Sequence, residues 1–167
     1  MTHTNALLNK TENGLNRLEV SKKYVNSAMM WLETWLTDDT FIDYVPQIAY
    51  LIETEKWDIL LDSFYQVIPF GTGGRRGLVG IGPNRINTWT IQASAQGHSR
   101  YLVRQYGEQA GQRGVVLAFD VRKYTQKGIY DETLANPVMN LDGPRLAKAA
   151  AAVYAANKIK VYMFRNE

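Results

Sequence analysis

Apolar side chains recur at helical spacing between residues 19 and 61, and this pattern predicts two or three amphipathic helices. The apolar positions are Val20, Tyr24, Met29, Trp31, Leu32, Trp35, Leu36, Ile48, Leu51 and Ile52. A polar run at residues 37–40 interrupts the spacing, so we expect one helix to end there and another to begin. Because large aromatic side chains dominate buried area, we expect Trp31, Trp35 and Trp57 to pack inward.

The pattern changes in the second half of the chain. Six of the twelve residues from Gly71 to Gly82 are glycine, which indicates backbone that takes positive φ or approaches another group closely. Residues 87–106 show helical spacing, and the alanine-rich stretch 141–157 predicts another helix. Short apolar runs at 114–120 and 159–164 have the pattern of buried strands. The order strand, helix, strand predicts a βαβ unit with a parallel sheet.

Length and composition fit one folded domain with an appendage. The 167 residues are close to the roughly 150 expected of a domain, and 46% hydrophobic with 21% charged residues is ordinary for a globular protein. The absence of cysteine excludes disulfides, thiolate metal sites and cysteine nucleophiles. The sequence has neither a long apolar run nor an apolar core in its first eleven residues, so we expect a cytoplasmic protein without a membrane span.

The net charge of +3 is unevenly distributed. Residues 1–70 hold five Lys/Arg and ten Asp/Glu, a net charge of −5, whereas residues 71–167 hold fourteen and six, a net charge of +8. We therefore expect an anionic partner to bind the second part. Charge alone does not distinguish nucleic acid, acidic membranes and phosphorylated metabolites.

The loop Phe-Gly-Thr-Gly-Gly-Arg-Arg-Gly at residues 70–77 outlines a phosphate site. It gathers backbone amides, a hydroxyl and two guanidinium groups within eight residues. Glycines let amides converge on an anion, and arginine presents a fork that matches phosphate oxygens. The spacing fits neither a dinucleotide-binding fingerprint nor a P-loop. The alternative is a glycine-rich connector with two solvated arginines.

Five segments of the chain, in order, resemble motifs of the α-D-phosphohexomutase superfamily, the phosphoglucomutases and phosphomannomutases. Residues 70–77 resemble Phe-Gly-Thr-(Ser/Ala)-Gly-Leu-Arg-Gly, and residues 82–90 resemble Gly-x-Asn-Arg-Met-Asn-x-x-Thr. Residues 95–102 resemble Thr-Gln-Gly-x-x-x-Tyr-Leu, and residues 119–125 resemble Tyr-Asp-x-Arg-x-x-Ser. Residues 155–164 resemble Ala-Ala-Asn-Gly-Ile-Lys-Val-Tyr. Five motifs in the family's order are a far more specific signal than any one of them.

The resemblance implies an α/β fold. Residues 67–167 would form a three-layer α/β/α domain with a mixed, mostly parallel sheet, the first domain of the family, after an N-terminal helical extension at residues 1–66. The implied reaction is intramolecular phosphoryl transfer on a sugar phosphate. A phosphoserine gives its phosphate to the sugar, the bisphosphorylated sugar reorients, and its other phosphate returns to the serine with the help of Mg²⁺. Catalysis of this kind rests on positioning and charge neutralisation.

The resemblance also implies roles for individual loop residues. Arg76 matches the arginine of the family loop, so we expect it to stabilise the transferred phosphate as a catalytic residue. Thr72 and the amides of Gly73 and Gly74 would frame the same phosphate site. Arg75 replaces an apolar residue of the family, and it is a further candidate phosphate ligand.

Residues outside the loop have two possible roles each. Arg122 follows a predicted strand, where ligands of α/β folds collect, so it is a candidate phosphate ligand. The alternative is an ion pair between Arg122 and Asp120 that fixes the turn. We expect Arg85 and Asn87 to hold the glycine-rich loop by hydrogen bonds to backbone carbonyls, and His98 to lie at the surface.

The family's phosphoserine loop, Thr-(Ala/Gly)-Ser-His-Asn-Pro, and its magnesium loop, Asp-x-Asp-x-Asp-Arg, occur nowhere in the 167 residues. We therefore expect a chain that ends before the serine loop, has no mutase turnover alone and binds no metal itself, Mg²⁺ belonging to the complete enzyme. The expected partners are a hexose 1- or 6-phosphate and the remaining mutase domains, with no nucleic acid and no membrane.

Two other functions stay open. One is a stand-alone sugar-phosphate-binding or scaffold domain derived from a mutase. The other is a nucleic-acid-binding module built on the basic second half of the chain, which shows no RNP, KH or zinc signature.

Overall fold

The computed structural model describes residues 2–164. The chain forms two compact units, the first of residues 1–86 with 125–139 and the second of residues 87–124 with 140–167. The boundary predicted between residues 66 and 67 stays a prediction, and in the structure residues 67–86 pack with the helices that precede them.

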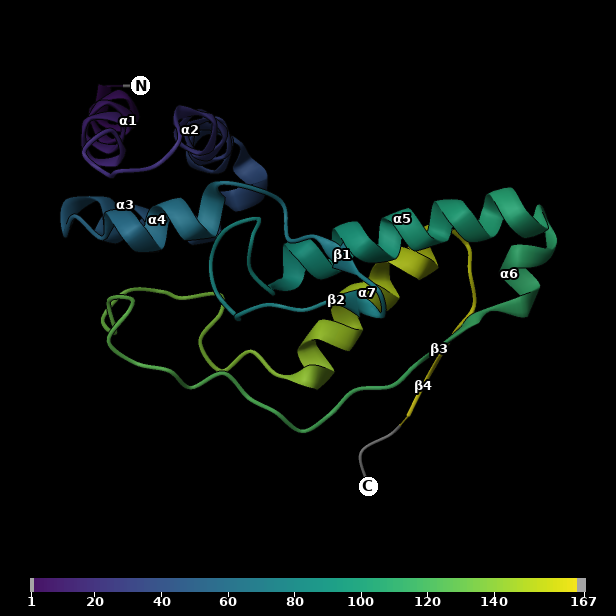
Figure 1. Cartoon of the computed structure of the whole chain (residues 1–167). Helices are drawn as coiled ribbons and strands as arrows, with labels where there is room; N and C mark the ends of the chain where they lie inside the picture. The colour runs from purple at the N-terminus through teal and green to yellow at the C-terminus, as the bar shows by residue number, and fades with distance from the viewer. Residues whose placement is uncertain (1, 165–167) are drawn as a thin grey trace. The chain divides into compact units, whose positions relative to one another are not determined.

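Helices dominate the first unit (Figure 1). They are α1 (Thr2–Leu15), α2 (Lys22–Thr37), the 3₁₀ helix η1 (Asp39–Tyr44), α3 (Val45–Glu53) and α4 (Trp57–Phe64). The helices predicted from periodicity are confirmed as α2, α3 and α4, and the polar run ends α2 as expected. Helix α1 was not predicted, because its buried side includes Thr11 and Gly14, which give no hydrophobic signal.

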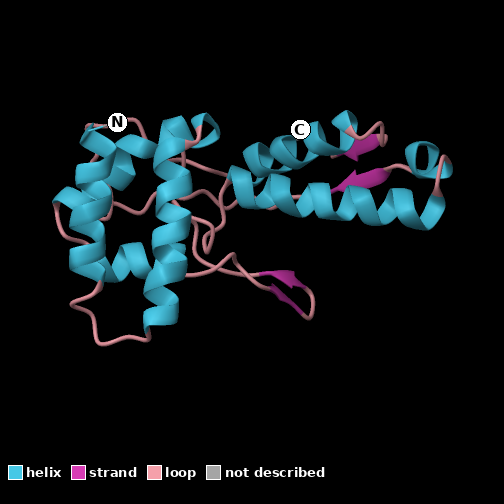
Figure 2. Ribbon diagram, turned by 90° about the horizontal axis from the view of Figure 1, so that it is seen from above, coloured by secondary structure: helices cyan, strands magenta, loops and turns pink. Residues whose placement is uncertain are grey.

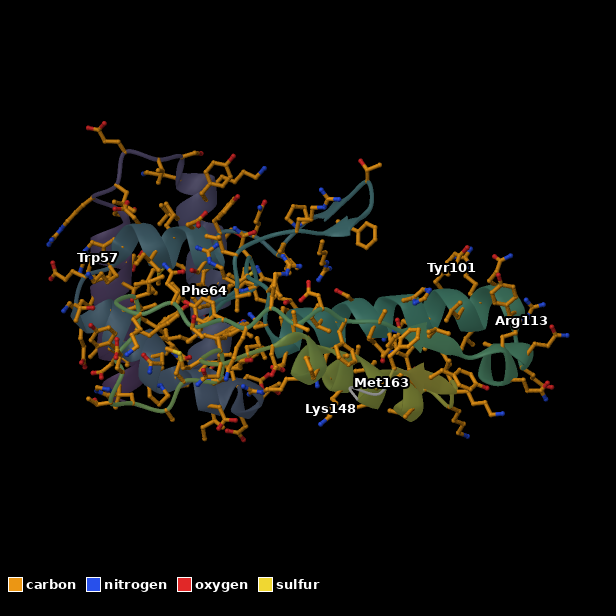
Figure 3. The ribbon with its side chains drawn as sticks, turned by 90° about the horizontal axis from the view of Figure 1, so that it is seen from below. Trp57, Phe64, Tyr101, Arg113, Lys148 and Met163 are labelled. Carbon is orange, nitrogen blue, oxygen red and sulfur yellow. The ribbon has the colours of Figure 1, made fainter. Side chains whose placement is uncertain are left out.

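Aromatic rings form the centre of this unit. Trp35 is fully buried, stacks on Phe41 with 4.3 Å between ring centroids, and meets Phe64 edge-on at 5.6 Å. Trp57 is half-buried, and its ring lies so close to Gly14 that a Cβ there would sit 2.4 Å from it. Figure 3 shows Trp57 and Phe64 among the side chains of these helices. Inward packing is thus complete for Trp35 and partial for Trp57.

The second unit is a βαβ arrangement with two additional helices. Its elements are α5 (Thr88–Tyr106), α6 (Gln109–Arg113), β3 (Val115–Leu117), α7 (Gly143–Ala156) and β4 (Val161–Met163). Strands β3 and β4 pair in parallel with Val115 opposite Val161, which confirms the predicted parallel βαβ unit. Helices α5 and α7 pack together around Ala95, Ala150 and Tyr154.

The fold is mixed α/β, as predicted, with small sheets in the described part of the chain. Strands β3 and β4 form one two-stranded sheet, and β1 (Phe70–Gly71) and β2 (Gly74–Arg75) form another. The three-layer arrangement with a mostly parallel sheet is not confirmed by residues 2–164 and stays a prediction. No helix among these residues is long and apolar enough to cross a membrane.

Candidate functional site

The glycine-rich loop forms a tight antiparallel hairpin in the first unit. Strands β1 and β2 pair with Phe70 opposite Arg75 and Gly71 opposite Gly74, and residues 72 and 73 make the turn (Figure 2). Gly74 has a φ of +126°, a conformation that side chains with a Cβ rarely adopt. The sequence folds this way because glycine occupies the position that needs that conformation.

The turn of the hairpin is open to solvent. Thr72, Gly73 and Arg76 are exposed, whereas Gly74 and Arg75 are half-buried. A Cβ built on Gly73 or Gly74 would meet no other atom within 4 Å. The five candidate phosphate ligands of the loop therefore lie together on one short segment whose backbone an anion can approach.

Residues 77–86 hold the base of the hairpin. Gly77 packs so tightly on Ile68 that a Cβ there would lie 2.6 Å from the Ile68 Cδ1 atom. The amide of Ile68 donates to the carbonyl of Pro83 at 2.9 Å, and that of Ile86 donates to Leu78 at 2.8 Å. Ile68 is itself buried, so an exposed turn stands on a packed base.

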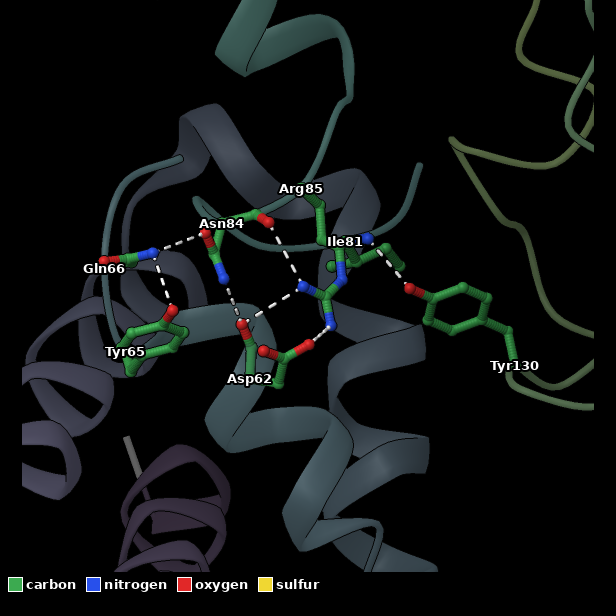
Figure 4. A network of polar contacts seen from close by, with 7 residues as sticks. All are labelled: Asp62, Tyr65, Gln66, Ile81, Asn84, Arg85 and Tyr130. Carbon is green, nitrogen blue, oxygen red and sulfur yellow. Dashed lines mark hydrogen bonds and ion pairs between the residues drawn. The ribbon is translucent and has the colours of Figure 1, made fainter. Parts of the chain in front are cut away.

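A polar network ties this base to the end of α4 (Figure 4). Arg85, only 8% exposed, forms an ion pair with Asp62 at 2.5 Å and donates to the carbonyls of Asp62 and Asn84 at 3.2 Å each. The Asn84 side chain also donates to the Asp62 carbonyl at 2.7 Å. The prediction that Arg85 donates to backbone carbonyls is confirmed, and the carbonyls are those of Asp62 and Asn84.

Close backbone contacts complete the base. Gly82 has a φ of +116°, and a Cβ there would lie 2.5 Å from the carbonyl oxygen of Ser63. The amide of Ile81 donates to the hydroxyl of Tyr130 at 2.9 Å, a contact that joins residues far apart in the sequence (Figure 4). Sequence reasoning missed Tyr130, because nothing local to it indicates a partner almost fifty residues away.

A buried glutamine binds residues 125–139 to the helices of the first unit. The Gln47 side-chain amide donates to the carbonyls of Asp131 at 2.9 Å and Ala135 at 3.1 Å. Its oxygen accepts a hydrogen bond from the Asp131 amide at 3.0 Å. The Gln47 side chain on α3 thus binds the backbone of this segment. The sequence offered no signal for this contact beyond a polar residue inside an apolar helix.

Asn87 has a different role from the one expected. Its side chain accepts a hydrogen bond from the Thr90 amide at 3.0 Å, and the Thr90 hydroxyl accepts one from the Asn87 amide at 3.0 Å. This reciprocal pair is a capping box that begins α5. The sequence signal for this capping box is an asparagine at position 87 followed three residues later by a threonine at position 90.

Arg122 belongs to the second unit and pairs with Asp120. Its Nε donates to the Asp120 carboxylate at 2.6 Å, and its backbone amide donates to the same carboxylate at 3.0 Å. Hydrogen bonds from Arg122 lower the pKa of Asp120, and those to Asp120 raise the pKa of Arg122. The structure thus shows the turn-fixing ion pair, and a phosphate contact by Arg122 stays a prediction.

Histidine and acidic groups do not gather into a metal site in the part of the chain that the structure describes. His98 is exposed, as predicted, and its Nδ1 lies 2.8 Å from the hydroxyl of Tyr154, whose pKa is raised by burial. Residues 2–164 hold no group of three His, Cys, Asp or Glu side chains that could bind a metal ion.

Comparison with curated proteins finds relatives whose names refer to sugar phosphates. The chain is 36% identical over 117 residues to a phosphopentomutase of Mus musculus, covering 70% of this chain and 17% of that protein. It is 32% identical over 130 residues to a glucose 1,6-bisphosphate synthase of Homo sapiens, covering 78% and 19%. A phosphoglucomutase of Staphylococcus aureus is 33% identical over 79 residues, covering 47% and 13%.

The chain thus spans less than a fifth of the length of these relatives. No protein-family profile matches the chain. No solved structure matches it either.

Proposed function

Because the chain belongs to the α-D-phosphohexomutase superfamily, we propose that it is the part of a sugar-phosphate mutase whose hairpin loop holds a phosphate group of the substrate. The observation that carries the proposal is the exposed hairpin at residues 70–77, fixed at its base by Arg85 and Asp62. A flexible connector would have no need of a buried arginine held by an ion pair, or of two close glycine contacts, beneath it. A site that must keep its donors in place does.

The chemistry of the loop suits a phosphate monoester. The exposed guanidinium of Arg76 offers paired N–H donors, and charge-assisted bonds of this kind are stronger than neutral ones. The Thr72 hydroxyl and the amides of Gly73 and Gly74 add neutral donors at the same turn. We propose Arg76 as the main phosphate ligand of the loop, with Arg75 as a further candidate there. Arg122, in the second unit, is a separate candidate phosphate ligand. Arg122 would have to leave or share its ion pair with Asp120.

The complete reaction would be phosphoryl transfer within a sugar phosphate. The relatives are named for pentose and glucose phosphates, which supports a phosphorylated sugar as the substrate here, a hexose 1- or 6-phosphate in our proposal. The phosphoserine would come from mutase sequence that these 167 residues do not include. Mg²⁺ would act in the complete enzyme, and the phosphate-binding step proposed for this chain uses no metal ion.

The proposed domain is the three-layer one of the family. Strands β3 and β4 would then be neighbours in a larger, mostly parallel sheet. The helices α5 and α7 pack around a core that reaches Val115 and Val161 on the strands, while Val116 is 67% exposed and Tyr162 is also exposed. An apolar sheet face of this kind is what a second helical layer would cover.

A binding measurement tests the phosphate site. We expect the 167-residue chain to bind glucose 1-phosphate in a calorimetric or NMR titration. Arg76→Gln should weaken that binding about 10- to 150-fold, since a charged hydrogen bond contributes about 1.5–3 kcal/mol. Arg100→Gln is the matched control, because Arg100 is an exposed arginine of α5 outside the loop. Equal affinities of the wild-type protein and Arg76→Gln would exclude the proposed site.

Turnover is a separate question. We expect the purified chain alone to convert no glucose 1-phosphate into glucose 6-phosphate, because it contains no serine in a Thr-x-Ser-His-Asn-Pro loop. The formation of glucose 6-phosphate should be measured for both the wild-type protein and Arg76→Gln. Conversion by a contaminating host enzyme would be the same in both preparations. Conversion that depends on Arg76 would show that the chain supplies its own phosphate carrier.

A further inference from the structure

The hairpin carries an aromatic ring that nothing in the first unit covers. Phe70 on β1 is 74% exposed, although a phenyl side chain in water is unfavourable. Its neighbours along the hairpin are glycines at 71, 73 and 74, which have no side chains to shield it. The ring of Phe70 is therefore open to contact with a ligand that binds the hairpin.

Pairing in the hairpin places the ring beside a cation. Phe70 lies directly opposite Arg75, and residues opposite each other in an antiparallel pair project from the same face, with Cβ atoms about 5 Å apart. The next pair, Gly71 opposite Gly74, projects from the other face and leaves bare backbone there. The hairpin therefore has one face with a phenyl ring and a guanidinium group, and one face with neither.

The combination of ring, guanidinium and amide donors matches the chemistry of a phosphorylated sugar. A pyranose or furanose ring has an apolar face of C–H groups that packs on an aromatic ring, and its hydroxyls and phosphate are hydrogen-bond acceptors.

We propose that the ring of Phe70 is the platform on which the sugar ring packs while the loop at residues 72–76, with Arg75 directly opposite the ring, holds its phosphate. This inference rests on the proposed phosphate-binding function and adds the part of the site that recognises the sugar. It gives the hairpin two separable contributions to affinity: donors that hold any phosphate monoester, and a ring that favours a cyclic sugar. An acyclic phosphate ester has no sugar ring and would gain little from packing on Phe70.

The experiment compares three probes on the full 167-residue chain: inorganic phosphate, glycerol 3-phosphate and glucose 1-phosphate. We expect wild-type protein to bind glucose 1-phosphate about 2- to 10-fold tighter than glycerol 3-phosphate, the range that one aromatic contact contributes. In Phe70→Leu this preference should disappear while the affinity for inorganic phosphate is kept. Phe70→Tyr retains the ring and should retain the preference.

Folding and surface effects are controlled in the same series. Phe70 is exposed, so Phe70→Leu should leave the thermal unfolding midpoint unchanged, and Ile42→Ala in η1, which also removes exposed apolar surface, should leave all three affinities unchanged. An unaltered preference for glucose 1-phosphate in Phe70→Leu overturns the sugar platform and leaves the phosphate site standing. Loss of inorganic phosphate binding in Phe70→Leu, or no preference in the wild-type protein, overturns it equally.

Failure of the underlying function has a different signature. If wild-type protein binds none of the three probes, or if Arg76→Gln binds inorganic phosphate as well as the wild-type protein does, the loop is not a phosphate site. The sugar platform is then overturned together with it. The two variants thus separate the ring's contribution from that of the guanidinium group.

Discussion

Arg85 is the most deeply buried charged residue in the described part of the first unit, and its hydrogen bonds explain why this burial is tolerated. Two of them end on backbone carbonyls and one on the Asp62 carboxylate, whose side chain is half-exposed. A buried guanidinium is favourable only when its N–H groups find acceptors, because desolvation alone is costly. Arg85 therefore holds α4 and the segment after the hairpin in one fixed arrangement.

Replacement of Arg85 should destabilise the first unit. We expect Arg85→Met, which keeps much of the aliphatic volume, to lower the free energy of unfolding by about 1–3 kcal/mol, because the Asp62 and Asn84 carbonyls lose buried partners. Urea unfolding followed by tryptophan fluorescence measures this, with Arg100→Met as an exposed control. A stability equal to that of the control would mean that water replaces the arginine without loss.

Gly82 offers a second prediction for one residue. We expect Gly82→Ala to cost about 2 kcal/mol or more, since its φ is positive and the new Cβ would collide with the Ser63 backbone. Gly73→Ala is the matched control, because a Cβ there meets nothing within 4 Å. Thermal unfolding of both variants would reveal whether the glycines of the loop differ as this geometry requires.

Among the structural elements, the turn at Asp120 responds to pH in a defined direction. Hydrogen bonds from Arg122 lower the pKa of Asp120, so the ion pair is intact at neutral pH and is lost as the pH falls through that lowered value. An NMR titration of the Asp120 carboxyl should give a midpoint below the usual aspartate range, and Arg122→Gln should return it there. A normal midpoint in the wild-type protein would mean that the pair is not formed in solution.

The segment 125–139 supports the base of the hairpin through the hydroxyl of Tyr130. We expect Tyr130→Phe to increase the hydrogen-exchange rate of the Ile81 amide several-fold, because that amide loses its acceptor. Amides in the middle of α5, which belong to the second unit, should exchange as before. Uniformly faster exchange across the chain would instead indicate general destabilisation.

Elements with local causes were predictable from the sequence, and contacts between distant residues were not. Periodicity identified α2 because its buried positions repeat every three or four residues, and alanine content identified α7 through helix propensity. Glycine density located the hairpin but not its register. The contacts of Gln47 and Tyr130 were invisible, since each depends on a partner that the fold brings in from far along the chain.

At the scale of the whole molecule, the sheet of the second unit leaves apolar side chains in water. Val116, Tyr162 and Phe164 are exposed on or next to two short strands. We expect the chain to self-associate at high concentration, and Val116→Lys to reduce this in sedimentation velocity runs, because a charge on such a surface opposes pairing. Val103→Lys on α5 is the control. Equal association of both variants would place the contact elsewhere.

The path of the chain also bears on how such a protein can be rearranged. Because residues 125–139 return to the first unit after the chain has entered the second, no single cut separates the two units into independent pieces. A recombination event or a fusion joined after residue 86 would leave Ile81 without Tyr130 and Gln47 without its backbone partners. A recombinant protein that preserves the hairpin must therefore take residues 1–86 and residues 125–139 from the same parent sequence.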